Sequence, residues 1–491
     1  MPETLRHRET LPLAEEWLPP PEGIERFDRI ANEPYSILLD SALRLPGIGR
    51  YAFFTAFPFL TLTSRATALT LRREDGAEER IEGDPFEALA GLLSAHALPA
   101  KAGLPPFQGG AAGAFSYDLG RLLEKIPSIA SDDLGLPETT LGFYDVAAAF
   151  DLEAGRGWLV STGFPKRGRA AEVRARERLE RFRTALEAPA PPAGDARILG
   201  ELRSGFDRPA YVRAVERVRR YIVEGDIFQA NLSQRFQAGF EGDAFALYRT
   251  LRRINPAPFA AFFRAPGADL VSASPERFLL VEGDRVQTRP IKGTRRRGAT
   301  VGEDRRLAED LLGSGKDRAE NTMIVDLLRN DLGRVCRPGS IRVADLCALE
   351  SFPTVFHLTS TVEGRLSAGR GRMDLLRAAF PGGSITGAPK VRAMEIIEEL
   401  EPVRRSFYTG AIGYFGFDGA MDLNIAIRTI LCAGGIAYYQ VGGGIVFDSD
   451  PEEEYEETMH KGRALAEALQ PDLPDRASRE TDQPDRTARG A

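Results

Sequence analysis

Residues 409–447, TGAIGYFGFDGAMDLNIAIRTILCAGGIAYYQVGGGIVF, decide the fold class. Short apolar runs are separated here by Asp418-Gly419, by Gly434-Gly435 and by the glycine run 442–444. Such glycine pairs favour tight turns between antiparallel strands, so the segment predicts a meander. Helical and strand patterns mix along the rest of the chain without a regular βαβ rhythm. We therefore expect an α/β protein of the complex α+β kind rather than a doubly wound sheet.

Strand and helix signals are also clear elsewhere. Residues 51–63 and 143–150 have the composition of strands, and 424–429 predicts a further strand. Asp207 and Asp450 each stand shortly before a proline and a helical pattern, which predicts a capped helix start.

The composition excludes several classes of protein. The 491 residues are 43% hydrophobic and 27% charged, as in globular domains, and the net charge of −7 gives no general attraction to nucleic acid. No run approaches the roughly 18 apolar residues of a membrane span, and the first residues lack the apolar run of a signal peptide. Three cysteines without metal-ligand spacing favour reduced core thiols. We expect a cytoplasmic protein with no nucleic-acid or membrane partner.

One proline-rich segment divides the chain. Residues 187–195, EAPAPPAGD, cannot bury enough surface to pack. We therefore predict an N-terminal region at 12–186, a linker at 187–195 and a C-terminal catalytic region at 196–469. The polar stretch 470–491 has no apolar periodicity and predicts a disordered tail.

The pentapeptide Pro290-Ile291-Lys292-Gly293-Thr294 places a lysine between a rigid proline and a flexible glycine. Residues 285–289 predict a strand and 295–298 a loop, so Lys292 is expected on an edge from which its amine can point into a cleft. A partly desolvated amine loses its proton more readily and becomes a nucleophile. Most loop lysines are only solvated charges. The nearby acid Glu276 and two carboxylate-bearing helices favour a site instead.

Those two predicted helices each offer carboxylates on one face. Asp317 and Glu320 stand three residues apart in the first helix, and Glu454, Glu457 and Lys461 follow one face of the second. In an isolated helix an acidic first turn is usually a solvated cap. Two such helices together suit an oxygen-liganded cation, and Mg²⁺ takes one or two carboxylates with water and substrate. Nothing in the spacing indicates zinc.

Further features can bind an anion. The glycine run 442–444 leaves backbone amides open to an anion, or is simply a flexible hairpin connection. Ser384 lies in a glycine-rich turn before a helix, although that turn lacks the ending of a nucleotide P-loop. Arg428 interrupts an apolar run, and a buried arginine needs a carboxylate partner, which a substrate can supply. His357, a lone histidine, is more often a structural hydrogen-bonding group than a catalyst.

These motifs together resemble the chorismate-utilising enzymes, which include anthranilate, aminodeoxychorismate, isochorismate and salicylate synthases. The resemblance covers residues 35–467. It rests on motifs in the family's order and spacing, namely DIFQ at 226–229, SPE at 274–276, ENTMIVD at 320–326, ITGAPK at 385–390 and ET at 457–458. It implies a fold in which two β-sheets pack face to face, with helices outside and the site in a cleft beside the core.

The resemblance also implies roles for individual residues. Glu320 and Glu457 resemble the ligands of a Mg²⁺ ion that holds the ring carboxylate of chorismate. Glu276 resembles the general acid on the C4 hydroxyl, and His357 matches a further catalytic position. The positions that match substrate-binding residues of the family are Tyr408, Arg428, Ser384, Gly442, Gly444 and Lys461.

Two positions divide the family. Isochorismate and salicylate synthases carry a lysine that activates water where this chain has Gln229, which cannot accept a proton at neutral pH, so ammonia fits better. Anthranilate synthases carry alanine at the place of Lys292, whereas aminodeoxychorismate synthases carry a lysine, whose amine can attack C2 of chorismate. The resemblance therefore implies formation of 4-amino-4-deoxychorismate. Anthranilate synthase component I and a non-catalytic chorismate-binding relative stay as alternatives.

The ammonia is expected to come from a separate chain. None of Cys336, Cys347 and Cys432 lies in a glycine-flanked nucleophile turn, and the four histidines are remote from them in sequence. The resemblance implies a glutamine amidotransferase subunit as the partner. It also implies a pocket near Ser41, which holds tryptophan in some family members for regulation or as a structural site, and the sequence does not decide between these.

Overall fold

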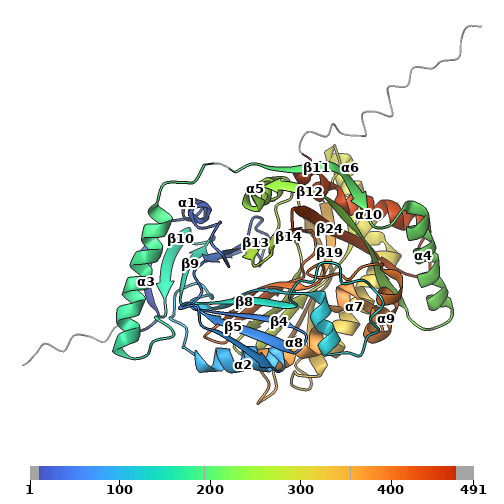
Figure 1. Cartoon of the computed structure of the whole chain (residues 1–491). Helices are drawn as coiled ribbons and strands as arrows, with labels where there is room; N and C mark the ends of the chain where they lie inside the picture. Colours follow the sequence, from blue (N-terminus) through green and yellow to red (C-terminus); the bar gives the residue numbers. More distant parts are fainter. Residues whose placement is uncertain (1–9, 193, 354, 471–491) are drawn as a thin grey trace, which may run out of the picture.

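Two antiparallel sheets, each of 12 strands, pack face to face, and helices cover their outer sides (Figure 1). The computed structural model describes residues 10–192, 194–353 and 355–470, so the predicted tail lies outside the described residues apart from Gln470. The predicted α/β fold of two packed sheets with outer helices is confirmed.

The first sheet combines strands from both ends of the chain. Its strands are β1 (Leu13–Trp17), β2 (Ile37–Asp40), β3 (Tyr51–Thr55), β9 (Val146–Asp151), β10 (Arg156–Ser161), β11 (Ala196–Ser204), β12 (Gln229–Gly242), β13 (Phe259–Ala265), β14 (Ala268–Ser274), β20 (Gly387–Ala388), β23 (Thr429–Ala433) and β24 (Ile436–Ile445). Their spatial order is β1-β10-β9-β3-β2-β13-β14-β23-β24-β12-β11, with β20 beside β12.

The second sheet is built in the same way. Its strands are β4 (Leu60–Arg65), β5 (Ala68–Arg73), β6 (Glu78–Glu82), β7 (Gly110–Phe115), β8 (Thr139–Tyr144), β15 (Arg277–Glu282), β16 (Arg285–Arg289), β17 (Ile291–Arg296), β18 (Arg342–Ser351), β19 (Val355–Arg365), β21 (Ala411–Gly416) and β22 (Met421–Asn424). Their order is β17-β19-β16-β15-β22-β21-β7-β8-β4-β5-β6, with β18 beside β19.

Helices close the two outer faces. The α-helices are α1 (Glu22–Glu25), α2 (Pro85–Ala95), α3 (Arg169–Glu187), α4 (Arg208–Val223), α5 (Ala244–Ile254), α6 (Val301–Gly313), α7 (Gly315–Gly333), α8 (Arg372–Ala379), α9 (Lys390–Leu400) and α10 (Pro451–Leu469), and short 3₁₀ helices are η1 (Arg26–Arg29), η2 (Tyr117–Leu122) and η3 (Gly383–Ile385). Helices α3, α5 and α10 pack on the first sheet, and α6 and α7 pack on the second. The predicted caps are confirmed, because Asp207 accepts the Ala210 N–H and Asp450 accepts two N–H groups of α10.

The part of the chain up to α3 and the part from β11 onward meet at one pair of neighbouring strands in each sheet, which we call a seam. In the first sheet β2 pairs with β13, and in the second β7 pairs with β21. Outward from each seam, the strands of the two parts follow the same order. In the first sheet, β2-β3-β9-β10 on one side corresponds to β13-β14-β23-β24 on the other. In the second sheet, β7-β8-β4-β5-β6 corresponds to β21-β22-β15-β16-β19. The topology is therefore duplicated, and both copies contribute to both sheets.

The chain passes directly from strand to strand between the sheets at four places, which form two equivalent pairs. The first pair joins β3 to β4 and β8 to β9, and the second joins β14 to β15 and β22 to β23. The strand-like stretches 51–63 and 143–150 are therefore each two strands in different sheets. The predicted strand over 424–429 is wrong, because the backbone must turn between the sheets here and Arg428 has a φ of 52°.

A buried ion pair holds the first pair of crossings. Asp145, between β8 and β9, accepts hydrogen bonds from Arg174 and Arg178 of α3 at 3.0 Å each. Arg178 also donates to the carbonyl of Phe57 in the crossing between β3 and β4, at 2.6 Å. One helix thus ties both crossings together.

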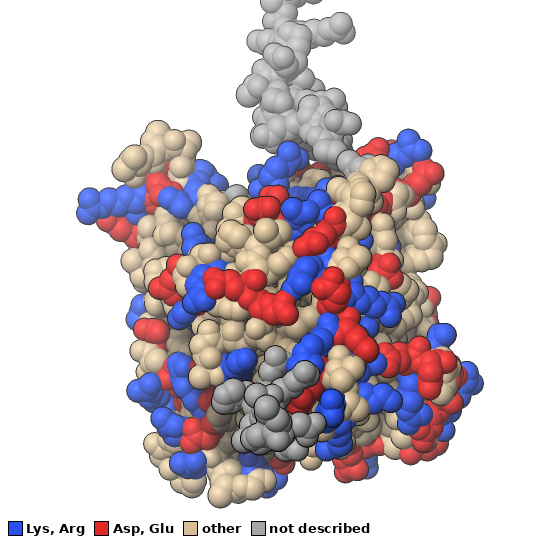
Figure 2. Space-filling model, turned by 90° about the vertical axis from the view of Figure 1, so that its left-hand side faces the viewer, with Lys and Arg blue, Asp and Glu red and all other residues tan. Residues whose placement is uncertain are grey.

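The outer surface mixes charges of both signs. From the α3 side, lysines and arginines alternate with aspartates and glutamates (Figure 2). Pairs such as Arg156–Glu16 account for part of this mixture. No helix among the described residues is long and apolar enough to cross a membrane.

We predict that Asp145→Ala destabilises the protein by about 3–5 kcal/mol, because it leaves the buried Arg178 without its carboxylate. The shift in the urea unfolding midpoint measures the effect. The control is Glu79→Ala, which removes an exposed ion pair with Arg73 and is expected to cost no more than about 1 kcal/mol. Equal midpoints for both variants would contradict the role of Asp145.

Candidate active site

The second pair of crossings carries two predicted site residues on neighbouring backbone segments. Glu276 lies between β14 and β15, and Arg428 lies between β22 and β23. The two crossings are hydrogen-bonded: the Ile425 N–H donates to the Glu276 carbonyl at 3.1 Å, and the Ala273 N–H donates to the Arg428 carbonyl at 3.0 Å. The inter-sheet geometry therefore fixes both backbones.

Glu276 is a buried carboxyl group with few partners. It is 4% exposed, and its Oε1 accepts a hydrogen bond from Ser384 Oγ at 2.5 Å. Burial raises its pKa to about 7, although the Ser384 hydrogen bond and the charge of Lys292 act in the opposite direction. A carboxyl group with this pKa is well suited to donate a proton near neutral pH.

Lys292 lies in β17, the edge strand of the second sheet, rather than at the start of a loop. The predicted loop over 295–298 is wrong in part, since β17 extends to Arg296. The pairing with β19 shifts register between Ile291 and Thr294, and Gly293 at that point has a φ of 85°. This irregularity turns the lysine inward. Its Nζ lies 2.9 Å from Glu320 Oε1, and the side chain is 10% exposed.

The carboxylates of the two helices converge on one strand. A Cβ atom at Gly443 would lie 2.9 Å from Glu454 Oε2 and 3.8 Å from Glu457 Oε1, and a Cβ atom at Gly444 would lie 2.5 Å from Glu320 Oε1. The glycine run lies within strand β24, so the alternative of a flexible hairpin connection is wrong. Glycine is required because any side chain would fill the space that these carboxylates occupy.

The donor set fits a magnesium ion. The carboxylates offered by α7 and α10 are oxygen donors, although no group of three or more His, Cys, Asp or Glu side chains in the described residues, this site included, is arranged to hold a metal. Mg²⁺ usually takes one or two carboxylates and completes its shell with water and substrate. Burial, reinforced by Glu457, raises the pKa of Glu454 to about 7. Such mutual repulsion between carboxylates is relieved by a cation.

In this structure the chain's own lysines neutralise the carboxylates. Lys461 Nζ lies 2.5 Å from Glu457 Oε1 and donates to the Gly442 carbonyl at 3.0 Å. The charge of Lys461 lowers the pKa of Glu457. Burial opposes the charge on Lys461, but Glu457 outweighs it, so the pKa of the lysine is raised.

His357 is buried and neutral. Its Nδ1 lies 2.9 Å from Thr294 Oγ1, two residues after Lys292, and the Phe352 ring meets it edge-on. Burial, together with the nearby charge of Arg428, lowers its pKa to about 3. An imidazole in this state can accept or donate a hydrogen bond but carries no charge at neutral pH.

Arg428 has no carboxylate partner within the described part of the chain. Its Nη1 donates to the Lys461 carbonyl at 2.8 Å, and no ion pair of the described residues includes it. Burial lowers its pKa, and burial raises that of its neighbour Tyr408. The predicted need for an external carboxylate at Arg428 therefore agrees with its surroundings.

Sequence reasoning missed a buried network behind the site. Glu401 and Arg405 are ion-paired across the non-helical segment that follows α9, and Arg405 donates to the carbonyls of Ile385 and Asn231. No local signal predicted this pair, because the two residues lie outside a helix and the i,i+4 spacing of a helix face does not apply to them. This network fixes the turn that carries Ser384.

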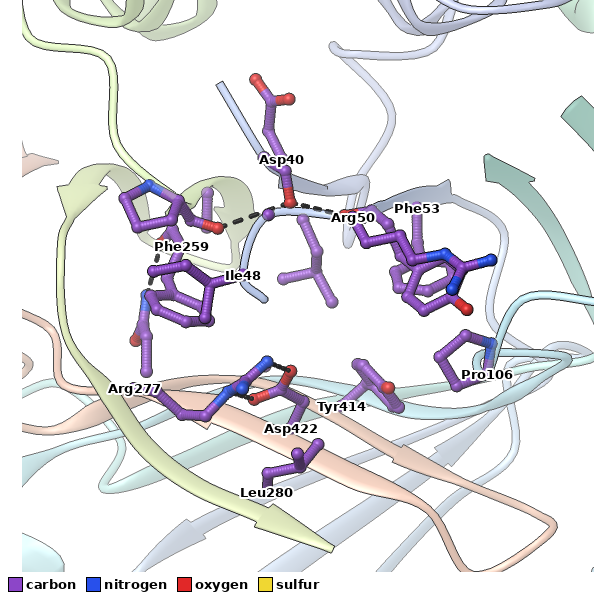
Figure 3. A pocket seen from close by; sticks show the side chains of 18 of the residues that line it. Asp40, Ile48, Arg50, Phe53, Pro106, Phe259, Arg277, Leu280, Tyr414 and Asp422 are labelled. Carbon is purple, nitrogen blue, oxygen red and sulfur yellow. Dashed lines mark hydrogen bonds and ion pairs between the residues drawn. The ribbon is translucent and has the colours of Figure 1, made fainter. Parts of the chain in front are cut away.

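A separate cavity of about 310 Å³ lies between the sheets near Ser41 (Figure 3). Arg277, next to Glu276 in the chain, lines it and is ion-paired with Asp422 at 2.9 Å. Asp40 points away from the cavity and accepts a hydrogen bond from Tyr248. The predicted pocket is therefore present.

Comparisons with known proteins agree with this architecture. The family described as chorismate binding enzyme matches residues 55–467. Aminodeoxychorismate synthase component 1 of Salmonella typhimurium is 42% identical, over 92% of this chain and 96% of its own length. Anthranilate synthase component 1 of Thermus thermophilus is 43% identical, over 89% of this chain and 92% of its own.

A solved structure agrees as well. Anthranilate synthase component I of Streptococcus pneumoniae superposes with a TM-score of 0.76 at 34% identity, over 86% of this chain and 93% of its own. The chain therefore belongs to the chorismate-binding enzyme family.

Proposed function

We propose that the protein is the synthase component that converts chorismate and ammonia into 4-amino-4-deoxychorismate. Overall identity does not separate this function from anthranilate synthesis, since relatives of both kinds are about equally similar. The observation that carries the proposal is the position of Lys292. Its amine is ion-paired with Glu320, and its charge lowers the pKa of the proton donor Glu276.

Lys292 and Glu276 would act as a pair. The neutral lysine amine adds to C2, both ring double bonds shift, and the C4 hydroxyl leaves as water with the proton of Glu276. The lysine nitrogen gives up one proton to the Glu276 carboxylate. Ammonia then adds at C4, both ring double bonds shift back, and Lys292 departs as a neutral amine with the proton of Glu276, after which the new ammonium group at C4 returns a proton to Glu276. The sum is chorismate plus ammonia giving aminodeoxychorismate plus water, and the lysine is regenerated.

The remaining residues would bind and orient the substrate. Glu320 and Glu457 would hold Mg²⁺, which supplies positive charge for the ring carboxylate of chorismate. Arg428 and Tyr408 would bind the enolpyruvyl carboxylate, joined by the amides of Gly442 and Gly444. Neutral His357 would donate or accept a hydrogen bond beside the ring. Lys461 would keep Glu457 ionised, because its charge lowers the pKa of that carboxyl group.

We predict that Lys292→Ala lowers kcat by on the order of 10³-fold or more, because the covalent route is lost. Lys292→Arg keeps the positive charge beside Glu320 but removes the nucleophile, and it is expected to be equally inactive. Product formation from chorismate and an ammonium salt is followed by mass spectrometry. The control is Lys166→Ala at an exposed loop position. An active Lys292→Arg enzyme would mean that the lysine acts only through its charge.

The raised pKa of Glu276 predicts that kcat/KM for chorismate depends on pH, with a falling limb on the alkaline side. The carboxyl group is protonated below about pH 7 and loses its proton above it, so kcat/KM for chorismate falls as the pH rises through 7. Ser384→Ala removes a hydrogen bond that lowers this pKa, so the limb moves to higher pH, whereas Ser384→Thr keeps it in place. The profile is measured at a constant concentration of unprotonated ammonia. An identical limb in all three proteins would contradict the assignment of Glu276.

The isolated chain is expected to use ammonia and to ignore glutamine. Cys336, Cys347 and Cys432 are all buried, and none is paired with a histidine in the described contacts. Glutamine should become a substrate only after a glutamine amidotransferase subunit is added. The purified chain is assayed with glutamine as the sole nitrogen donor, with ammonium as the positive control. Robust product formation from glutamine alone would refute the two-subunit proposal.

A further inference from the structure

The segment between α9 and β21 presents Tyr408 on a strained backbone. Ser406 has a φ of 51° and Thr409 a φ of 60°, values that residues other than glycine rarely adopt. Such conformations persist only where the surrounding structure holds them in place. The groups that hold this segment therefore also decide where the Tyr408 side chain points.

Both backbone polar groups of Ser406 are bound by the part of the chain up to α3. The Ser406 N–H donates to Asp118 Oδ2 at 2.9 Å, and the Tyr117 N–H donates to the Ser406 carbonyl at 2.8 Å. Tyr117 and Asp118 begin η2, directly after β7, and each is 6% exposed. A buried carboxylate that accepts a backbone N–H makes a strong hydrogen bond. The peptide groups on both sides of Ser406 are thus fixed from across the second seam.

The Arg405 side chain extends this support to the Tyr408 ring. Its guanidinium carbon lies 4.9 Å from the centre of the Tyr117 ring and 5.8 Å from the centre of the Tyr408 ring, within the range of a cation–π contact. The ion pair with Glu401 prevents the guanidinium from turning away. The Tyr117 hydroxyl is buried without a partner, so Tyr117 acts through its ring and its N–H.

The other end of Tyr408 is left to a ligand. Within the described residues Tyr408 is hydrogen-bonded only through its backbone, to the Arg405 carbonyl and the Thr409 hydroxyl. Its side chain and that of Arg428 lie close enough for each to affect the pKa of the other. A phenol and a guanidinium can both donate to one carboxylate. The direction of the Tyr408 hydroxyl therefore bears on substrate binding.

We propose that Tyr117 and Asp118 are positioning residues of the active site. They hold residues 405–409 so that the Tyr408 hydroxyl faces the substrate carboxylate beside Arg428. The part of the chain up to α3 thus contributes to chorismate binding without touching chorismate. This inference rests on the proposed function, in which Tyr408 binds the enolpyruvyl carboxylate.

The first test is Asp118→Ala, which frees the Ser406 N–H. We expect KM for chorismate to rise about tenfold, as for the loss of one hydrogen bond to a charged group. KM for ammonium should stay within about twofold, an order-of-magnitude bound on an indirect effect. Both constants are measured with Mg²⁺ and an ammonium salt, at a temperature at which circular dichroism shows every variant to be folded.

The matched control is Asp145→Ala, which removes another buried carboxylate from the same part of the chain. It is expected to lose more stability than Asp118→Ala, because Arg121, the ion-pair partner of Asp118, keeps Glu398 as a second partner. Its KM for chorismate should nevertheless stay within about twofold of wild type. An equal rise of KM in both variants would mean that lost stability is the cause, and the inference would be wrong.

A double-mutant cycle tests whether Asp118 acts through Tyr408. Tyr408→Phe keeps the ring that faces Arg405 but removes the hydroxyl, so it should itself raise KM for chorismate about tenfold. If Asp118 only positions this hydroxyl, then Asp118→Ala adds less than about twofold in the Tyr408→Phe protein. Effects that multiply to about a hundredfold would show that the two residues act independently and would overturn the inference. An unchanged KM in Tyr408→Phe would overturn it as well.

Tyr117 offers a second pair of variants that does not depend on the folding of Asp118→Ala. Tyr117→Leu removes the ring beside Arg405, and KM for chorismate should rise severalfold. Tyr117→Phe keeps the ring and loses only a hydroxyl without a partner, so KM should return to the wild-type value. Equal KM values in these two variants would contradict a positioning role of the ring.

Failure of the proposed function is distinguishable from failure of this inference. If the wild-type protein forms anthranilate instead of aminodeoxychorismate, the proposed function is wrong. The double-mutant cycle still decides about Tyr117 and Asp118, because both reactions begin with the binding of chorismate.

Discussion

A chain that builds two face-packed sheets must pass from one to the other, and this constraint shapes the whole molecule. At each direct crossing the backbone leaves the strand conformation and its peptide groups need new partners. Here the crossings come in pairs that satisfy each other. In the first pair, Thr55 Oγ1 donates to the Val146 carbonyl, and in the second, Ser274 Oγ donates to the Ile425 carbonyl, both at 2.6 Å. The equivalent hydroxyl groups reflect the duplicated topology.

The two pairs of crossings have diverged in their use of charge. Asp145 in the first pair is ion-paired with two arginines of α3, which makes that corner a structural element. In the second pair, Glu276 accepts a hydrogen bond from Ser384 but forms no ion pair with a described residue. Arg428 donates a hydrogen bond only to the carbonyl of Lys461. Incomplete compensation costs stability. At this corner it leaves a carboxyl group with a pKa near neutrality and a guanidinium that is available to an anionic ligand.

Much of the fold could be predicted from the sequence, because local signals agree with it. The turns at Asp418-Gly419 and Gly434-Gly435 and the aspartate caps of α4 and α10 are short-range features, and the structure confirms them, whereas the predicted break at 442–444 is wrong because this run lies within β24. The sequence also indicated that Lys292 and Glu320 belong to one site, because each lies in a recognisable motif, and the structure adds the contact between them. The roles of the site residues and the division at 187–195 stay predictions.

Other features depend on distant parts of the chain and left no local signal. The crossing at 425–428 has the apolar composition of a strand, and only its place between the two sheets breaks it. Residues 291–296 become a strand because β19 lies beside them, although the arginines there favour a loop. The contact of Gln229 with Glu320 likewise appears only when β12 and α7 are assembled.

The seams between the two parts of the chain have one more consequence. The segment between α3 and β11 is the covalent join between the parts, whereas β2–β13 and β7–β21 hold them together through main-chain pairing inside both sheets. A protease that cuts between α3 and β11 would therefore produce two fragments on a denaturing gel but one particle in solution. Each fragment alone would expose a long unpaired strand edge at both seams, which is a known cause of aggregation. The two parts could therefore be encoded as separate polypeptides only if both were synthesised at the same time in the same cell.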